Sequence, residues 1–192
     1  RYAAVVGRAA PTAPAQNTLF VADAKTGQQL DAWKIEAVSG VSFTRQGRLI
    51  AGSGTKIVEV DSAGKVARVL AEAGGPVWDV EALADGGFVA SVGEPRNQVV
   101  YFDAQGKETR ALGKPGGRPR CGKMLPASFR NPVGLCVAGN GRLFVAENAA
   151  PRRFTRWSPD GKLERQFHGP YYFSGMFGVD DEHPEDVYAD TH

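Results

Sequence analysis

The sequence has few cysteines and no long apolar run, and each shortage excludes a class of protein. Only two of the 192 residues are cysteine, Cys121 and Cys136, too few for a disulfide framework or a zinc cage. We expect one loop thiol and one buried strand thiol rather than a disulfide joining them. No stretch reaches the roughly 20 continuous apolar residues of a membrane-spanning helix, so we expect no insertion into a membrane.

The charge is also nearly balanced, with 23 basic and 21 acidic residues and a net charge of +2. A balance of this kind gives no global field toward nucleic acid or anionic lipid. Asp31, Glu36, Asp79 and Glu81 dilute any local basic patch further. By contrast the chain is rich in glycine (24) and proline (12) and has only two methionines, which favours many short strands joined by tight turns.

An internal repeat in the sequence indicates which all-β architecture to expect. Polar turns followed by apolar runs recur, and the turn glycines that close the second run of each unit fall at positions 27, 64, 106 and 161. The spacings are therefore 37, 42 and 55 residues, of which the first two match or approach a propeller blade of about 40 to 50 residues. Three apolar runs share one pattern: Gly47 to Ala51, Gly86 to Ala90 and Gly141 to Val145.

Each unit divides into four strands, which we call A to D in chain order. In the fourth unit these are 134–137, 142–146, 153–157 and 163–167. The first unit begins at strand B, and the last stops after its own strand B. The sequence therefore predicts a β-propeller of four-stranded antiparallel blades, with partial blades at 1–36 and 173–192 and complete ones at 37–73, 74–113 and 129–168.

Three complete and two partial blades do not close a ring by themselves unless the terminal strands share a blade. We expect a fragment of a six- or seven-bladed ring, with a compact four-bladed closure as the alternative. The remaining blades, or an appended domain, would then lie outside this chain.

The fourth unit resembles an NHL-type repeat. Phe129, Pro132 and Gly134 precede strand A, and Gly141 then introduces an apolar strand B that ends at the acid Glu147. The match is good over about one blade. It implies a propeller fold, and by analogy with large secreted propeller proteins an extracytoplasmic bacterial setting.

The chain also resembles the gluconolactonase and regucalcin propellers, but it lacks the acidic metal ligands of that family. The segment Gly75-Pro76-Val77-Trp78 is similar to a Glu-Gly-Pro-x-Trp motif of that family, but Gly74 stands where the metal-binding Glu is expected. Val133 likewise stands where a ligand Asp is expected, between Pro132 and Gly134. Neither residue supplies the oxygen ligand that a divalent metal needs.

Other catalytic patterns are missing as well. The sequence contains no phosphate-binding glycine loop, paired metal-ligating histidines or nucleophile elbow. The three histidines, His168, His183 and His192, lie near the end of the chain. The acidic run from Asp180 to Asp186 lacks the spacing of a preformed calcium loop and fits a solvated turn better. We therefore predict no catalytic residue, metal or cofactor in this stretch.

In a propeller the D–A and B–C connections emerge on one face, which we call the loop face, and the A–B and C–D turns emerge on the other, the turn face. All the long, irregular segments map to the loop face, which is where binding usually resides on a rigid scaffold. Basic residues gather there, and aromatic residues follow the fourth unit. The candidate ligand-binding residues are Arg96, Asn97, Arg120, Glu147, Asn148, Arg152, His168, Tyr171 and Tyr172.

Two of these residues carry an alternative reading, because Glu147 and Asn148 fit hydrogen bonding between blades equally well. The leading functional hypothesis is a non-catalytic recognition scaffold that binds a protein, peptide or glycan on the loop face. The first alternative is a fragment of a propeller hydrolase or lyase whose catalytic residues lie elsewhere. The second alternative is single-stranded RNA binding, which the near-neutral charge disfavours.

Overall fold

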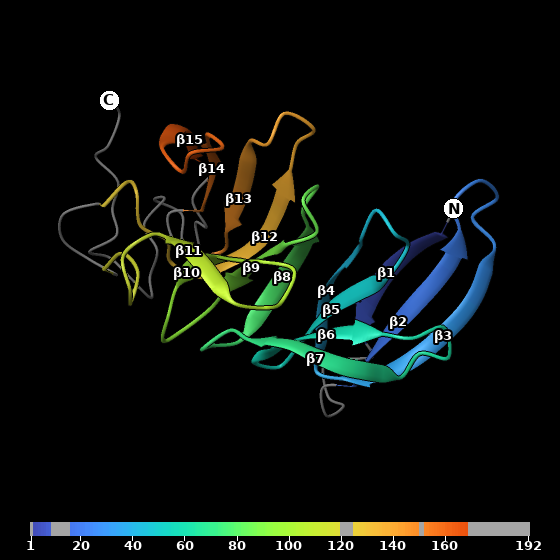
Figure 1. Cartoon of the computed structure of the whole chain (residues 1–192). Helices are drawn as coiled ribbons and strands as arrows, with labels where there is room; N and C mark the ends of the chain where they lie inside the picture. Colours follow the sequence, from blue (N-terminus) through green and yellow to red (C-terminus); the bar gives the residue numbers. More distant parts are fainter. Residues whose placement is uncertain (1, 9–15, 120–124, 150–151, 169–192) are drawn as a thin grey trace, which may run out of the picture.

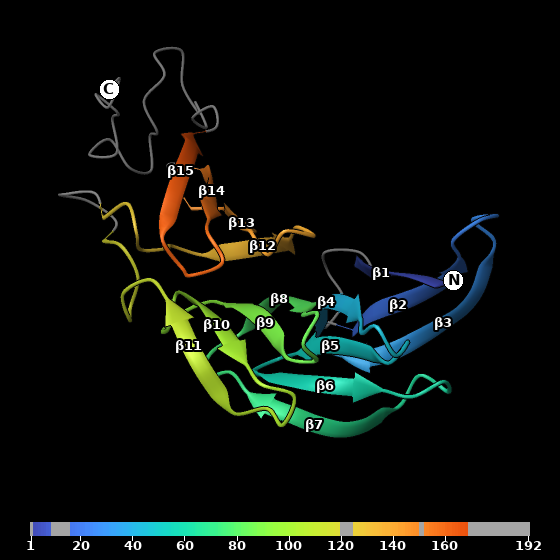
Figure 2. The ribbon, with the colours of Figure 1, turned by 45° about the horizontal axis from the view of Figure 1, so that its top comes forward.

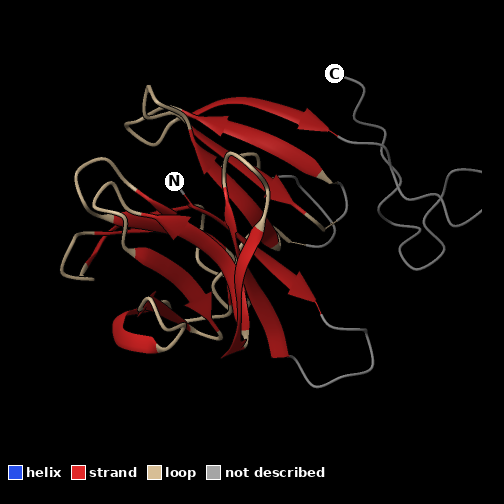
Figure 3. Cartoon of the chain, turned by 90° about the vertical axis from the view of Figure 1, so that its right-hand side faces the viewer, coloured by secondary structure: helices blue, strands red, loops and turns tan. Residues whose placement is uncertain are grey.

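The computed structural model describes residues 2–8, 16–119, 125–149 and 152–168, and every regular element among them is a β-strand (Figure 3). The predicted partial blade at 173–192 lies outside the described residues. No helix occurs in the described segments, and so none there is long and apolar enough to cross a membrane.

The strands form four separate antiparallel sheets in which neighbours in sequence are neighbours in space (Figure 1). The first sheet has three strands: β1 (Tyr2–Arg8), β2 (Gln16–Asp23) and β3 (Gln29–Glu36). The second contains β4 (Val38–Phe43), β5 (Leu49–Ser53), β6 (Lys56–Val60) and β7 (Val66–Glu72). The third contains β8 (Val77–Ala82), β9 (Phe88–Val92), β10 (Gln98–Phe102) and β11 (Glu108–Leu112). The fourth contains β12 (Pro132–Val137), β13 (Leu143–Glu147), β14 (Arg153–Trp157) and β15 (Leu163–His168).

Five-residue turns of one kind join the A–B and C–D strands of the second, third and fourth sheets. In the turn after β10, the Gly106 N–H donates to the Asp103 carbonyl at 3.0 Å, and the Asp103 N–H donates to the Lys107 carbonyl at 2.9 Å. The fourth residue of each turn is a glycine with φ between 75° and 93°, a region that glycine enters without steric cost. The same pair of bonds recurs at 44–48, 61–65, 83–87, 138–142 and 158–162.

The sheets stack face to face, and both faces of an inner sheet are apolar because each covers a neighbour. On β5, Leu49 and Ala51 belong to the core against the first sheet, whereas Ile50 belongs to the core against the third. A third core lies between the third and fourth sheets around Phe129 and Trp157. The consecutive apolar residues of the B strands therefore serve two cores.

The innermost strands of the last three sheets, β4, β8 and β12, lie beside one another, as the views in Figures 1 and 2 agree. Each carries an irregularity near its start: the pairing register shifts between Val38 and Val41, between Val77 and Asp79, and between Pro132 and Gly134. Such bulges increase the local twist of a strand. The result is an all-β, propeller-like fan of sheets with the first strand of each inside (Figure 2).

The outward face of the fourth sheet has no cover among the described residues. Phe144, Phe154 and Phe167 lie on that face and are 36%, 59% and 50% exposed. The residues at the equivalent positions of the second and third sheets are at most 7% exposed: Ile50, Ile57, Ala71, Val89, Val99 and Leu112. Cys136 shares this face and is exposed, so the prediction of a buried strand thiol is wrong for it.

Candidate functional site

The long connections of the third and fourth sheets meet on the loop face. They are the D–A segments 73–76 and 113–131 and the B–C segments 93–97 and 148–152, with 120–124 and 150–151 outside the described residues. The second sheet contributes only Gly54 and Thr55 between β5 and β6. Among the described residues, the long segments of the loop face therefore belong to the third and fourth sheets.

A buried carboxylate anchors the long D–A segment. The Glu147 side chain is fully buried at the end of β13, where Arg118 Nε donates to its Oε2 at 3.1 Å and Arg153 Nε donates to its Oε1 at 2.5 Å. The Arg130 N–H donates to the same Oε2 at 2.7 Å. Arg153 also donates to the carbonyls of Pro126 and Ser128. The network therefore fastens residues 118–130 to the fourth sheet.

Two residues of the 93–97 segment hold the loops in the same way. Arg96 donates to the Ala73 carbonyl at 3.0 Å, to Gln98 Oε1 at 2.9 Å and to Glu108 Oε1 at 2.5 Å. Asn97 is buried in the left-handed region with φ 48°, and its Oδ1 accepts the Asn131 N–H at 2.9 Å. Both side chains thus act as braces between loops.

A hollow of about 380 Å³ opens between these braced loops, lined by Pro76, Trp78, Glu94, Arg130, Asn131 and Ala149. Trp78 is the residue of β8 that is left unpaired by the register shift, and it is 39% exposed. Gly93 permits this position, because a Cβ at residue 93 would lie 2.5 Å from the indole Nε1 of Trp78. Glu94 is exposed, and Arg130 is half-buried.

This lining combines a flat aromatic surface with one acidic and one basic side chain. An indole offers stacking area to a sugar ring or a planar side chain, and the carboxylate and guanidinium offer an acceptor and donors. The arrangement suits binding and orientation of a polar ligand.

An unusual carboxyl group follows Trp78 in the sequence, at Asp79. Burial raises the pKa of Asp79 to about 6, opposed by hydrogen bonds from the N–H groups of Leu135 and Val80, each 2.9 Å long. The side chain fits because Gly40 has no Cβ there; a Cβ on Gly40 would lie 2.0 Å from Asp79 Oδ1. Asp79 therefore links the inner strands of three sheets.

Glu81 is the second partly buried acid on β8. Burial raises its pKa, and a hydrogen bond of 2.8 Å from the Ser42 hydroxyl opposes the shift. Asp79 and Glu81 thus lie on an inner strand rather than in the loops of the loop face. Within the described segments, no group of three or more acids, histidines or cysteines could hold a metal ion.

The remaining predicted residues are not among the lining residues of the hollow or lie outside the described residues. Asn148 is exposed, and its N–H donates to the Asn131 carbonyl at 3.1 Å. Arg152 and His168 are exposed. Arg120, Tyr171 and Tyr172 lie outside the described residues.

Sequence reasoning missed Trp78 and Glu94 as lining residues of this hollow. Both carried a signal: Trp78 follows the Gly75-Pro76 pair that prompted the family comparison, and Glu94 belongs to a B–C loop on the predicted loop face. Basic residues were predicted as ligand contacts instead. Arg96, however, donates its hydrogen bonds to Gln98, the Ala73 carbonyl and Glu108.

Comparison with known proteins supports the fold and gives no information on function. No protein-family profile matches the chain, and no curated protein matches its sequence. Among solved structures it is similar to a protein of unknown function from Bacteroides caccae, with a TM-score of 0.61 and 13% sequence identity. The match covers 83% of this chain and 62% of that protein, so this chain spans less than two thirds of its length. The resemblance to NHL-type repeats stays a prediction.

Proposed function

We propose that this chain is a non-catalytic recognition scaffold that binds a protein, peptide or glycan on the loop face, with its contact centre at Trp78, Glu94 and Arg130. The observation that carries the proposal is the hollow of about 380 Å³ that these residues line between two rigidly braced loops. Preformed concave sites with a few polar groups are the usual form of a ligand site. Bracing by Glu147, Asn97 and Arg96 reduces the entropy lost on binding.

The proposal is tested by screening the protein on a glycan array and a peptide library, followed by affinity measurements on the ligands found. Replacing Trp78 with Ala should weaken binding by at least about 10-fold, since exposed aromatic anchors dominate interface energies. Glu94→Gln should weaken it less and retain the shape of the hollow. Lys107→Ala, an exposed residue of the turn face, is the matched control and should bind normally.

If Trp78→Ala binds with unchanged affinity and has an unchanged circular dichroism spectrum, the hollow is not the binding site. A steep loss of binding with salt for oligonucleotides would favour the RNA-binding alternative instead.

The second candidate is a fragment of a propeller hydrolase or lyase, favoured by one observation: Asp79, next in sequence to Trp78, has a pKa of about 6. A carboxyl group that titrates near neutrality suits general acid or base catalysis. This candidate ranks second because both Asp79 oxygens accept backbone N–H bonds. Turnover in a hydrolase panel that Asp79→Asn abolishes would reverse the ranking.

We further infer that the sheets are blades of a six- or seven-bladed ring. The exposed face of Phe144, Phe154 and Phe167 supports this inference, because the equivalent face of each inner sheet is covered by the next sheet. Phe20 supports it at the other end: it is 37% exposed on the outward face of the first sheet, whereas its equivalent Val58 is buried.

A further inference from the structure

One cross-strand pair differs markedly in size among the three interfaces between sheets. In the third sheet this pair is Phe88 and Phe102, whose rings stack with centroids 5.2 Å apart and fill the interface with the second sheet. In the fourth sheet the pair is Leu143 and Trp157, and the Trp157 indole lies 5.1 Å from the Phe129 ring. Aromatic rings thus fill this position at two interfaces.

At the interface between the first and second sheets the same pair is Leu49 and Val60, which carry no ring. A hollow of about 440 Å³ occurs there, on the turn face between β2 and β3 on one side and β5 and β6 on the other. Leu49 and Val60 are smaller than Phe88 and Phe102 and leave part of this interface open. The hollow is the size of one small organic ligand.

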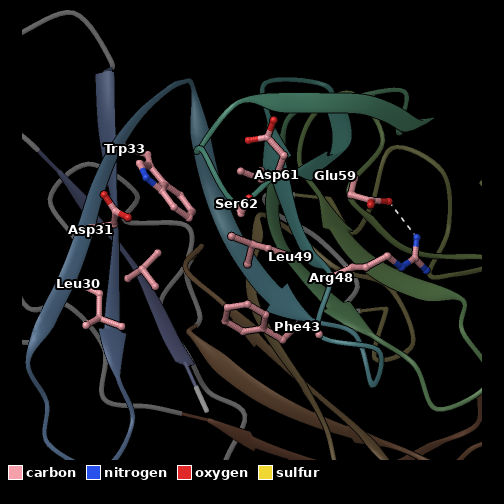
Figure 4. Close-up of a pocket in the computed structure, with 12 residues that line it drawn as sticks. Leu30, Asp31, Trp33, Phe43, Arg48, Leu49, Glu59, Asp61 and Ser62 are labelled. Carbon is pink, nitrogen blue, oxygen red and sulfur yellow. Dashed lines mark hydrogen bonds and ion pairs between the residues drawn. The ribbon is translucent and has the colours of Figure 1, made fainter.

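Figure 4 shows the walls of this hollow. The Trp33 indole extends from β3 into the space between the sheets, Leu49 faces it from β5, and Phe43 lies at the other end. The Trp33 indole packs closely against the C–D turn of the second sheet, where a Cβ on Gly64 would lie 2.1 Å from the indole Cγ. The indole therefore forms an aromatic wall that contacts both sheets.

The rim of the hollow carries excess negative charge. Glu59 is neutralised by Arg48 at 2.9 Å and Arg68 at 2.8 Å. Asp31 and Asp61, one from each sheet, are exposed and form no ion pair within the described segments. Asp61 Oδ1 accepts the N–H groups of Ala63 and Lys65, each at 2.9 Å.

We propose that this hollow binds a small molecule in which a planar aromatic ring carries a cationic amine. The ring takes the place that Phe88 and Phe102 fill at the next interface and lies beside the Trp33 indole. The amine lies at the rim, where Asp31 and Asp61 provide the complementary charge and the indole face adds cation–π attraction. The site is on the turn face and is independent of the loop-face site proposed above.

The test uses tryptamine as the probe and indole-3-acetate as its oppositely charged counterpart, with titration calorimetry on the full chain. Tryptamine should bind at one site per chain, and indole-3-acetate at least about 10-fold more weakly. The two probes share the indole ring, but the negative rim attracts the amine of tryptamine and repels the carboxylate of indole-3-acetate. The double variant Leu49→Phe, Val60→Phe copies the third sheet and should abolish tryptamine binding while the free energy of unfolding stays equal or rises. Trp78→Ala, in the loop-face hollow, should leave tryptamine binding unchanged.

A second variant keeps the test decisive should the double variant fail to fold. Asp31→Lys changes an exposed side chain, and it should weaken tryptamine at least about fivefold and narrow the preference over indole-3-acetate. The proposal is overturned if tryptamine does not bind at millimolar concentration. Equal affinity for the two probes, or binding that survives filling of the hollow, would also overturn it.

Discussion

At the scale of single residues, Asp79 gives the stability of the protein a pH dependence opposite to that of an ordinary salt-bridged acid. Its pKa is about 6 in the folded state and near 3.8 in the unfolded chain, so between these values the folded state holds the extra proton. Its contribution to the free energy of unfolding is therefore largest below about pH 4 and falls as the pH rises to 6, by at most roughly 2 to 3 kcal/mol.

Replacing Asp79 with Asn should remove this fall. The readout is the difference in free energy of unfolding between wild type and variant, measured by urea denaturation from pH 4 to pH 7. The free energy of unfolding of the variant should rise relative to that of the wild type as the pH rises. A difference that is the same at every pH reports the changed hydrogen bond to Leu135 or Val80. A difference that does not vary with pH would show that Asp79 titrates normally.

Glu147 provides the second residue-scale prediction. Its carboxylate is the shared ion-pair partner of the buried guanidinium groups of Arg118 and Arg153, so Glu147→Gln adds one uncompensated buried charge and should lower the free energy of unfolding by about 3 to 5 kcal/mol. Glu164 is the matched control, because it also pairs with two arginines, Arg142 and Arg156, but at the surface. Glu164→Gln should cost no more than about 1 kcal/mol. Similar losses in both variants would contradict the structural role given to the buried network.

At the scale of single elements, two C–D turns with glycine at the same kind of position should respond differently to alanine. Gly27 and Gly64 both have positive φ, of 70° and 75°, but a Cβ on Gly27 meets open space whereas one on Gly64 runs into Trp33. Gly27→Ala should cost about 1 to 2 kcal/mol from backbone strain alone. Gly64→Ala should cost about 1 to 3 kcal/mol more, because the indole must move. Thermal unfolding of both variants measures the difference, and equal melting temperatures would show that Trp33 is not held by the turn.

The elements also show what the sequence could predict. The four strands of the fourth sheet lie at or within two residues of their predicted bounds, because turn glycines and apolar runs are local signals. The position of Asp79 could not be predicted in this way. Its space comes from the missing Cβ atom of Gly40, which lies in another sheet, and no local pattern reveals such a match.

The candidate site shows the same division. Segment 93–97 was assigned to the loop face from the repeat, and it does contribute Glu94 to the hollow. The braces could not be separated from binding residues, because a basic residue in a loop looks the same in sequence whether it faces solvent or, like Arg96, a carbonyl of the preceding loop.

At the scale of the whole molecule, the chain is a fan of similar sheets whose two faces are differently equipped. The turn face repeats one five-residue turn, whereas the loop face carries the braced segments of the third and fourth sheets. A rigid scaffold with irregular loops at one end concentrates recognition there. The outward face of the fourth sheet, with Phe144, Phe154 and Phe167, is apolar like the face by which the third sheet packs against the fourth.

Hydrogen–deuterium exchange with and without a ligand found in the array or library screen tests the central claim most directly. Binding at the loop face should slow exchange in residues 93–97, in 125–131 and at the start of β8, and leave the turns at 61–65 and 103–107 unchanged. Protection confined to the turn face, with none in the 93–97 and 125–131 segments, would contradict the account.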